Sequence, residues 1–251
     1  DITGAAVSGF EDLTLANDAG VTMTAAQNNA FTGGTVTASG SETIAIADDG
    51  GVTTLADIEN YTIGDDSTDA RTINVTQTGV AVTATAATDA VTFDIQNGLD
   101  FDGSLTGDNG TADTALLNDG TDIADATLTD VSTLTVASGA TVTMTVAQHN
   151  AFTTFTGTSD QTISLADGGT LTGESVIESY NLSNDGSDFT LGAASQDVTG
   201  GSGNDTVQSS AAIDALTGTL AGGAGGTDVL VLDDGDDITG AAVSGFEDLT
   251  L

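Results

Sequence analysis

Two glycine-rich segments near the end of the sequence contain the residues best suited to chemistry. The first, GGSGNDTVQ, covers residues 200–208 and places Gly200, Gly201 and Gly203 ahead of Asp205. Glycines at these spacings allow a tight turn whose carbonyl oxygens point inward, and the aspartate adds a carboxylate oxygen. Ca²⁺ takes six to eight oxygen ligands of this kind. The segment therefore predicts a calcium-binding turn.

One such turn cannot complete a calcium shell, so a second turn is expected beside it. The segment GGAGGTDVL, residues 222–230, offers Gly222, Gly223, Gly225 and Asp228, with one extra residue before its aspartate. We predict that the two segments together form the metal site and that Ca²⁺ is the cofactor. The alternative is a pair of glycine-rich turns in which each aspartate only caps the backbone.

The corresponding stretch in the first half of the chain has lost this pattern. Residues 84–92, ATAATDAVT, keep Asp89 and Val91 but none of the three glycines. We predict that this copy does not bind calcium. A second turn, GDNG at residues 107–110, leaves both alternatives open.

The charge of the chain excludes several classes of function. Among 251 residues there are 38 acidic residues and a single basic one, which gives a formal net charge of −37. Nucleic acids and anionic membrane surfaces both require Lys and Arg, so neither is an expected partner. No apolar stretch approaches the ~20 residues of a membrane-spanning helix. Cations, and copies of the chain itself, are the expected partners.

Catalysis finds little support in the sequence, and we predict that the protein is not an enzyme. The chain has no Cys and no Lys, and its one histidine, His149, matches Asn28 in a repeat of the sequence, so we expect it at the surface. Arg71 stands near Asp66 and Asp69, with which we expect a local ion pair of little energetic weight.

Internal repeats organise the whole chain. Residues 1–15, DITGAAVSGFEDLTL, recur unchanged at 237–251, which defines a repeat of 236 residues (237 minus 1) and the start of the next. Within it, residues 1–121 and 122–236 are two diverged halves. The halves align Met23 with Met144 and Tyr61 with Tyr180, which predicts that these four side chains pack in the core.

Short alternating runs of Val, Ile, Leu and Thr, bounded by Gly, Asp, Asn and Ser, predict an all-β fold. We favour a β-solenoid, either a parallel β-helix or a calcium roll, with about 20–25 residues per turn, because small apolar residues suit a thin core. A chain of β-sandwich modules is the alternative. Residues 24–31 and 145–152 begin with Thr followed by Ala or Val and then Gln, which favours one or two helical turns.

With its nonapeptide at 200–208, the imperfect copy at 222–230 and the following segment DDGDDITGAAVSGFEDLTL, the sequence resembles RTX-type secreted repeat proteins. These include bacterial surface-layer proteins and giant adhesins. The resemblance implies type I secretion, folding that depends on calcium after export, and a place outside the cell or on its surface.

Together these features predict a structural repeat that forms an elongated, calcium-stabilised β rod in an adhesin, filament or surface layer. The partner would then be the same chain, either in a tandem array or in a homopolymer. A carbohydrate-binding or ice-binding module of a secreted adhesin is the alternative function.

Overall fold

The computed structural model describes every residue except 65–69, 86–88, 109, 111 and 212. The chain folds as an all-β solenoid of about 11 turns, with little helix. It divides into two compact units, Asp1–Thr135 (unit 1) and Val136–Leu251 (unit 2). Within the described part of the chain, neighbouring strands pair in parallel, as they do in a solenoid. In a β-sandwich they would form antiparallel sheets. The prediction of a β-solenoid is confirmed.

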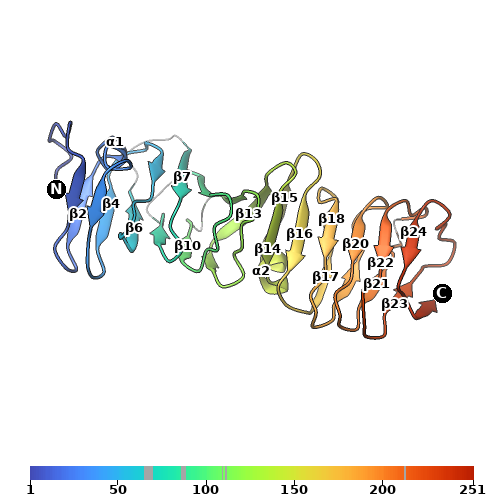
Figure 1. Ribbon diagram of the computed structural model, residues 1–251. Coiled ribbons are helices and arrows are strands. Elements are labelled where there is room, and N and C mark those ends of the chain that lie inside the picture. Colours follow the sequence, from blue (N-terminus) through green and yellow to red (C-terminus); the bar gives the residue numbers. More distant parts are fainter. Residues whose placement is uncertain (65–69, 86–88, 109, 111, 212) are drawn as a thin grey trace. The chain divides into compact units, whose positions relative to one another are not determined.

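In unit 1, alternate strands go to two different sheets (Figure 1). A separate pair at the N-terminal end consists of β1 (Asp12–Thr14) and β3 (Thr35–Thr37). The first sheet consists of β2 (Gly20–Met23), β4 (Thr43–Ile46), β6 (Asn60–Ile63), β8 (Ala81–Thr83), β10 (Ser104–Thr106) and β12 (Thr127–Thr129). The second contains β5 (Val52–Thr53), β7 (Arg71–Val75), β9 (Val91–Ile95), β11 (Asp113–Leu117) and β13 (Val131–Val136).

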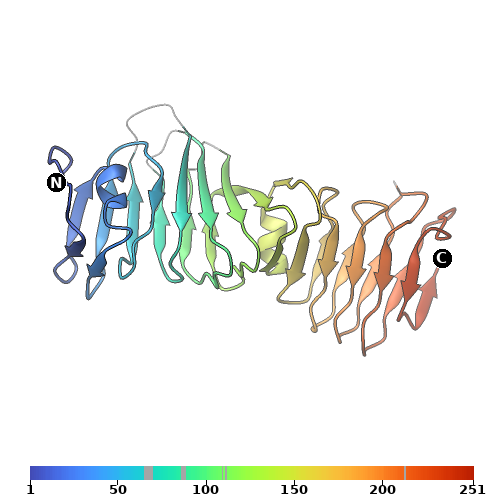
Figure 2. The same cartoon turned by 45° about the horizontal axis from the view of Figure 1, so that its top comes forward.

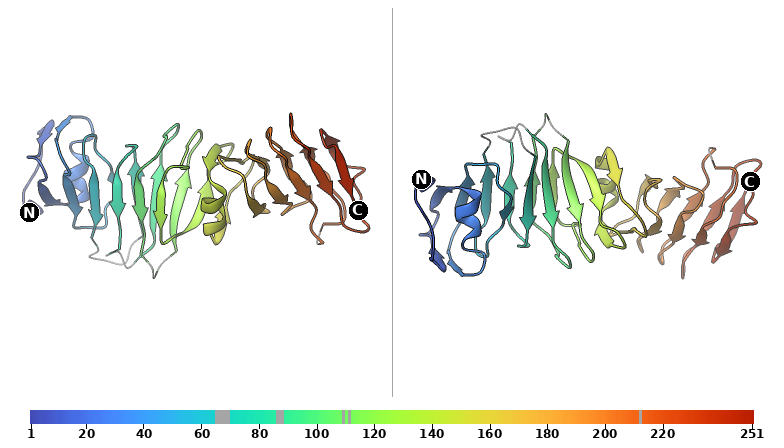
Figure 3. Two further views of the ribbon diagram at one scale, coloured as in Figure 1. Left: turned by 90° about the horizontal axis from the view of Figure 1, so that it is seen from below. Right: turned by 90° about the horizontal axis from the view of Figure 1, so that it is seen from above.

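Unit 2 repeats this alternation, and its two layers of strands can be followed in Figure 3. Apart from β15 (Thr154–Thr156), even and odd strands again occupy separate sheets. One consists of β14 (Thr141–Met144), β16 (Thr162–Leu165), β18 (Ser179–Asn181), β20 (Asp197–Thr199), β22 (Thr219–Ala221) and β24 (Ala242–Ser244). The other consists of β17 (Thr170–Thr172), β19 (Asp188–Thr190), β21 (Thr206–Gln208), β23 (Val229–Val231) and β25 (Asp248–Thr250).

The turns are shorter than predicted. Thr43 lies opposite Asn60, a step of 17 residues, whereas Ser104 lies opposite Thr127, a step of 23. The expected range of 20–25 was therefore too high at its lower end. Strands of only two to six residues, joined by tight corners, close some turns with fewer residues than we assumed.

Stacked apolar side chains form the core of each unit. In unit 1, Ile44, Tyr61 and Val82 lie opposite one another on successive strands and are buried. In unit 2, Ile163, Tyr180 and Val198 form the matching row. Because strand side chains alternate with a period of two, every second residue of these strands faces inward. Both tyrosines and both methionines, Met23 and Met144, are buried, which confirms their predicted place in the core.

A short helix lies in each unit where the sequence predicted one. They are α1 (Ala25–Asn29), near the first strands of unit 1 in Figure 2, and α2 (Val146–Ala151). Thr24 and Thr145 are the N-caps, and the side chain of Gln27 or Gln148 bonds back to the cap residue, so each start is a complete capping box. Neither helix, nor any other in the described residues, is long and apolar enough to cross a membrane.

Candidate metal centre

The two glycine-rich segments lie on adjacent turns of unit 2. Strand β21 follows the first and β23 follows the second, and Val207 lies opposite Leu230 in the register that joins them. Asp205 and Asp228 immediately precede these strands, and both are buried. The structure thus brings the two predicted carboxylates to neighbouring positions in one stack.

Asp205 and Asp228 belong to a row of four residues, each immediately before a strand of the same sheet: Ser187, Asp205, Asp228 and Glu247. We call this the carboxylate row. Each carboxylate in it accepts a hydrogen bond from the backbone N–H one turn earlier. Asp205 Oδ1 accepts from Ser187 (2.8 Å), Asp228 Oδ1 from Asp205 (2.8 Å), and Glu247 Oε2 from Asp228 (2.8 Å).

Two polar atoms in the row have no hydrogen-bond partner although they are buried. Asp205 Oδ2 accepts from the N–H of Gly201 in its own loop (2.9 Å). Asp228 Oδ2 has no such donor. The Ser187 hydroxyl also has no hydrogen-bond partner. The second glycine-rich segment, which has one extra residue before its aspartate, supplies no donor to Asp228 Oδ2.

The predicted glycines are needed because the two loops touch through their backbones. A β-carbon on Gly200 would clash with the carbonyl oxygen of Gly222, and one on Gly223 would clash with that of Gly201. Gly223 also has a positive φ of 117°, a region that residues with a β-carbon rarely adopt. The remaining predicted glycines lie in the same loops: Gly203 packs against Gly186, and Gly225, with φ 128°, lies over Ser202.

The electrostatics of the row favour neutralisation by a bound positive charge. Burial raises the pKa of the Asp205 carboxyl, the bonds from Ser187 and Gly201 lower it in part, and the charge of Asp228 raises it again. A buried polar atom without a hydrogen-bond partner is costly. Asp228 Oδ2 is such an atom, and Ser187 Oγ, which also has no partner, lies two turns earlier in the row.

The oxygen atoms of this region are of the kind that a hard cation binds. Within the described ranges, no group of three or more His, Cys, Asp or Glu side chains is placed to hold a metal. A cation here would use two carboxylates, from Asp205 and Asp228, and complete its shell with carbonyl oxygens of the glycine loops. Ca²⁺ accepts this mixture, because it takes carboxylate and carbonyl oxygens in flexible numbers.

Unit 1 carries a single carboxylate where unit 2 carries this pair. Asp113 matches Asp228 in the repeat, and its two oxygens accept from the N–H groups of Val91 (2.6 Å) and Asp108 (2.6 Å). Val91 therefore takes the position of Asp205, whereas the sequence alignment assigned that position to Asp89. The strand register corrects the alignment by two residues. Part of each stretch, at 86–88 and 109, lies outside the described residues.

Sequence reasoning missed Ser187 and Glu247, which complete the carboxylate row. A signal was present, since each row member directly precedes a short Thr- or Val-containing strand. The same signal identifies Glu42 and Glu59 in unit 1, where Glu59 Oε2 accepts from the N–H of Glu42 (3.0 Å). A carboxylate or polar side chain at the start of a strand thus recurs as a link between successive turns.

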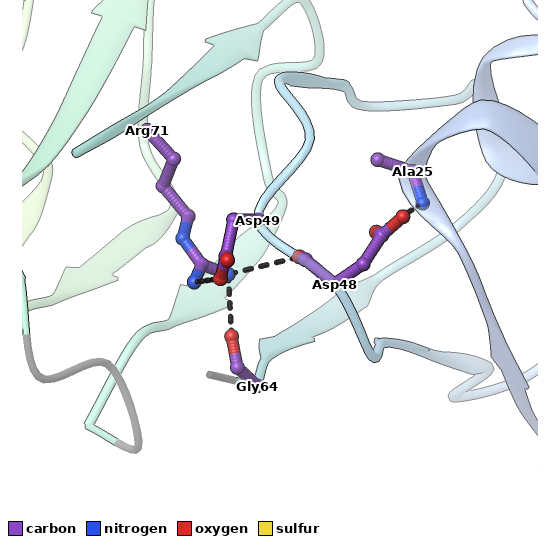
Figure 4. Close-up of polar contacts among 5 residues, drawn as sticks. All are labelled: Ala25, Asp48, Asp49, Gly64 and Arg71. Carbon is purple, nitrogen blue, oxygen red and sulfur yellow. Dashed lines mark hydrogen bonds and ion pairs between the residues drawn. The ribbon is translucent and has the colours of Figure 1, made fainter. Parts of the chain in front are cut away.

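The single arginine is buried. Its guanidinium forms an ion pair with Asp49, from the preceding turn, and donates to the carbonyl oxygens of Asp48 (3.1 Å) and Gly64 (Figure 4). The expected partners Asp66 and Asp69 lie outside the described residues. A buried pair of this kind is strongly destabilising to break, by about 3–5 kcal/mol, unlike an exposed one.

His149 is also buried, so its predicted place at the surface was wrong. Its Nε2 lies 3.2 Å from the hydroxyl of Tyr180, which also accepts a hydrogen bond from the N–H of Glu174 (2.9 Å). In unit 1 the Tyr61 hydroxyl donates to Asn28 Oδ1 (3.3 Å) in the same place. The histidine therefore has the structural role that Asn28 has in the other half.

Comparison with known proteins identifies no relative: no family model, no curated protein and no solved structure matches this chain.

Proposed function

We propose that this chain is a structural repeat of an extracellular bacterial surface protein, whose stacked β turns are stabilised by calcium bound beside Asp205 and Asp228. The solenoid supports a mechanical role, because each added turn extends the stack while its backbone groups bond to the turns before and after it. The resemblance to RTX-type proteins supports export by type I secretion and assembly in an adhesin, filament or surface layer.

The unpartnered Asp228 Oδ2 is the observation that carries the calcium part of the proposal. A second carboxylate, that of Asp205, lies one turn earlier in the same row. A cation bound there would neutralise buried negative charge and tie two turns of unit 2 together. When bound, Ca²⁺ would supply positive charge and oxygen coordination only, and no catalytic step is proposed.

The test is thermal unfolding of the full chain, followed by far-UV circular dichroism, in millimolar CaCl₂, in chelator, and in MgCl₂ at equal ionic strength. We expect calcium to raise the melting temperature of the wild type more than magnesium does, because ligand binding to the folded state stabilises it. Asp228→Asn should abolish that calcium-specific shift.

Asp113→Asn in unit 1 is the matched control. It alters an equally buried carboxylate whose two oxygens already accept backbone hydrogen bonds. We expect it to lower the melting temperature by the same amount in calcium and in chelator. A wild type that melts at one temperature in all three solutions would contradict the calcium proposal and leave a metal-independent solenoid.

A second candidate, ice binding, is favoured by one observation. Although the turns differ in length, their register aligns threonines in a single outward column on the first sheet of unit 1, interrupted once by alanine: Thr22, Ala45, Thr62, Thr83, Thr106 and Thr129. Strands about 4.8 Å apart would space these groups regularly. The column beside it is mixed, with Asn60, Ala81 and Ser104, so the structural role is preferred. A thermal hysteresis assay showing no activity would dismiss this candidate.

A further inference from the structure

Two glutamates on successive turns of unit 1 bring their carboxyl groups into contact. Glu42 directly precedes β4, and Glu59 directly precedes β6, which pairs with β4. Glu59 Oε2 accepts a hydrogen bond from the N–H of Glu42 (3.0 Å), and the two side chains are also hydrogen-bonded to each other. Ionised carboxylates only accept hydrogen bonds, so a bond between two carboxyl groups requires a proton on one of them.

The carboxyl group of Glu42 is completely buried and is held in place by its own loop. Its Oε1 accepts from the N–H of Ser39 (3.1 Å), and its Oε2 accepts from the N–H of Gly40 (3.0 Å). The group cannot turn away from Glu59 without breaking a backbone hydrogen bond, which is costly for a buried donor. The contact between the two glutamates is therefore built into the turn.

Unit 2 has the same arrangement with an amide in place of one carboxyl group. In the repeat, Gln161 matches Glu42 and Glu178 matches Glu59. Gln161 is equally buried, and with its amide oriented to match its neighbours its nitrogen donates to Glu178 Oε2 (2.6 Å) and its oxygen accepts from the N–H of Ser159 (2.9 Å). Glu178 Oε2 also accepts from the backbone N–H of Gln161 (3.0 Å). The amide hydrogen thus marks a position at which unit 1 has no hydrogen unless a carboxyl group carries one.

The charges around the pair favour a proton on it. Asp18, on the preceding turn, accepts from the backbone N–H next to Glu42 (3.0 Å). Asp57 and Glu59 line a recess together with residues 77–80 of the following turn, which bring no ionisable side chain. The single arginine of the chain is engaged in its own ion pair. An ionised Glu59 would therefore meet negative charge from Glu42, Asp18 and Asp57, and like charges favour the protonated form.

We propose that Glu42 and Glu59 share one proton in the folded protein at neutral pH, which Glu59 carries and donates to Glu42, and that this proton links two turns of unit 1 in a pH-sensitive way. It takes the place of the Gln161 amide hydrogen in unit 2. The inference goes beyond the proposed structural function and does not depend on calcium, because neither glutamate belongs to the candidate metal centre.

The environment of Glu42 agrees with its role as the acceptor. Burial raises the pKa of the Glu42 carboxyl, whereas the hydrogen bonds from Ser39, Glu59 and Gly40 lower it, and the lowering prevails. Glu42 is therefore the ionised member of the pair, and Glu59 donates the bond between the two side chains. Two carboxyl groups in contact release their protons in separate steps that belong to the pair.

The shared proton makes unit 1 less stable as the pH rises. In the unfolded chain both glutamates ionise near the ordinary pKa of about 4.3, whereas the folded pair keeps one proton above that pH. Because the folded state then binds more protons, its stability falls with rising pH until the pair releases the proton. The unfolding equilibrium constant increases by up to about tenfold per pH unit over this range. Gln161 has no proton to lose, so the matching contact in unit 2 does not have this dependence.

Carbon NMR of the full chain, labelled with ¹³C at the glutamate carboxyl carbon, tests the proton directly, because the sequence has only six glutamates. Spectra are recorded over a pH titration in chelator, which removes divalent cations. We expect one protonated carboxyl signal at pH 7 that is lost in Glu42→Gln, where an amide supplies the hydrogen. The signal of Glu174, whose pKa is raised by burial, should be unchanged in that variant. Full ionisation of Glu42 and Glu59 at pH 7 would overturn the proposal.

Exchanging the two residues between the units tests the consequence for stability. Glu42→Gln gives unit 1 the amide of unit 2, and Gln161→Glu gives unit 2 the carboxyl pair of unit 1. Between pH 5 and pH 8 in chelator, the melting temperature should fall less with rising pH in Glu42→Gln than in the wild type, and more in Gln161→Glu. His149 is present in all three proteins, so its titration cancels in the comparison. The same pH dependence in all three would overturn the proposed link.

The calcium-dependent melting described above is measured on the same variants. Glu42→Gln should keep the calcium-specific shift, because the candidate metal centre lies in unit 2. A calcium shift without a protonated pair would leave the proposed function standing while this inference fails, and a protonated pair without a calcium shift would mean the reverse.

Discussion

At the scale of single residues, buried polar groups link one turn of the solenoid to the next. Asp205, Asp228 and Asp113 each accept a backbone N–H from the preceding turn. Arg71 likewise pairs with Asp49, whose position lies 22 residues earlier (71 minus 49). The residues in each contact are far apart in the sequence, but they lie on adjacent turns of the solenoid. Polar side chains therefore specify register as well as satisfying backbone groups.

His149 provides a residue-scale prediction about pH. The Tyr180 hydroxyl accepts the Glu174 N–H and lies 3.2 Å from His149 Nε2 in the core of unit 2. Burial lowers the pKa of His149 below its ordinary value of 6.5, and a hydrogen bond with Asn150 raises it in part. Because the unfolded chain binds this proton first, the contribution of neutral His149 is complete above about pH 6.5 and is lost as the pH falls towards the lowered pKa.

We expect His149→Asn, which copies Asn28, to reduce the loss of stability between about pH 7 and pH 5. The difference amounts to at most ~1.4 kcal/mol for each unit by which the pKa is lowered. Urea unfolding at several pH values measures it. Asn28→His in unit 1 is the reciprocal variant and should steepen the same slope. Parallel pH profiles for the wild type and both variants would show that burial of His149 has no cost on protonation.

At the scale of elements, the short helices depend on their caps, because five or six residues do not form a stable helix alone. The Thr145 side chain accepts from the Gln148 N–H (3.1 Å), and Gln148 Oε1 accepts from the Thr145 N–H (2.9 Å). An aspartate of the next turn adds a third contact: Asp167 Oδ1 accepts from the Val146 N–H (2.7 Å). Unit 1 has the same arrangement, in which Asp48 Oδ1 accepts from the Ala25 N–H (2.7 Å).

We expect Thr145→Ala to destabilise unit 2, and Thr24→Ala to destabilise unit 1, each by about 1 kcal/mol, the usual value of an N-cap. Urea unfolding measures both. Thr145→Ser, which keeps the hydroxyl acceptor, is the matched control and should retain most of the stability. An alanine variant as stable as its serine counterpart would mean that the aspartate of the next turn holds the helix start without the cap.

The elements were predictable from the sequence to the extent that they depend on local pattern. Alternating apolar residues identified the strands, and Thr with Gln three residues later identified both helix starts. Contacts between turns were harder, because they depend on turn lengths that vary from 17 to 23 residues. That variation explains why Asp49 was missed as the partner of Arg71 and why Val91 was not matched to Asp205. His149 was expected at the surface for another reason: its repeat partner Asn28 is polar, and both residues are in fact buried. The adjacency of the two glycine-rich segments was predictable because their spacing equals one turn.

At the scale of the whole molecule, charge is the dominant feature that the fold must accommodate. A formal net charge of −37 is distributed over a chain with one arginine, and that arginine is buried. Mutual repulsion of the carboxylates opposes the folded state, where they are closest, more than it opposes the extended unfolded chain. Dissolved ions reduce this repulsion over distances greater than about 10 Å at 0.1 M salt.

We therefore expect stability to rise with ionic strength, the reverse of a protein held together by surface ion pairs. Raising NaCl from about 10 mM to 0.5 M should increase the melting temperature, by roughly 2–4 °C for each 1 kcal/mol of repulsion removed. Choline chloride should act similarly, because screening depends on ionic strength and not on the cation. Asp228→Asn should keep this dependence while losing the calcium-specific shift, which separates general screening from a specific site. A melting temperature that falls on addition of NaCl would mean that attractive electrostatic contacts, such as that of Arg71, outweigh the repulsion of the acidic surface.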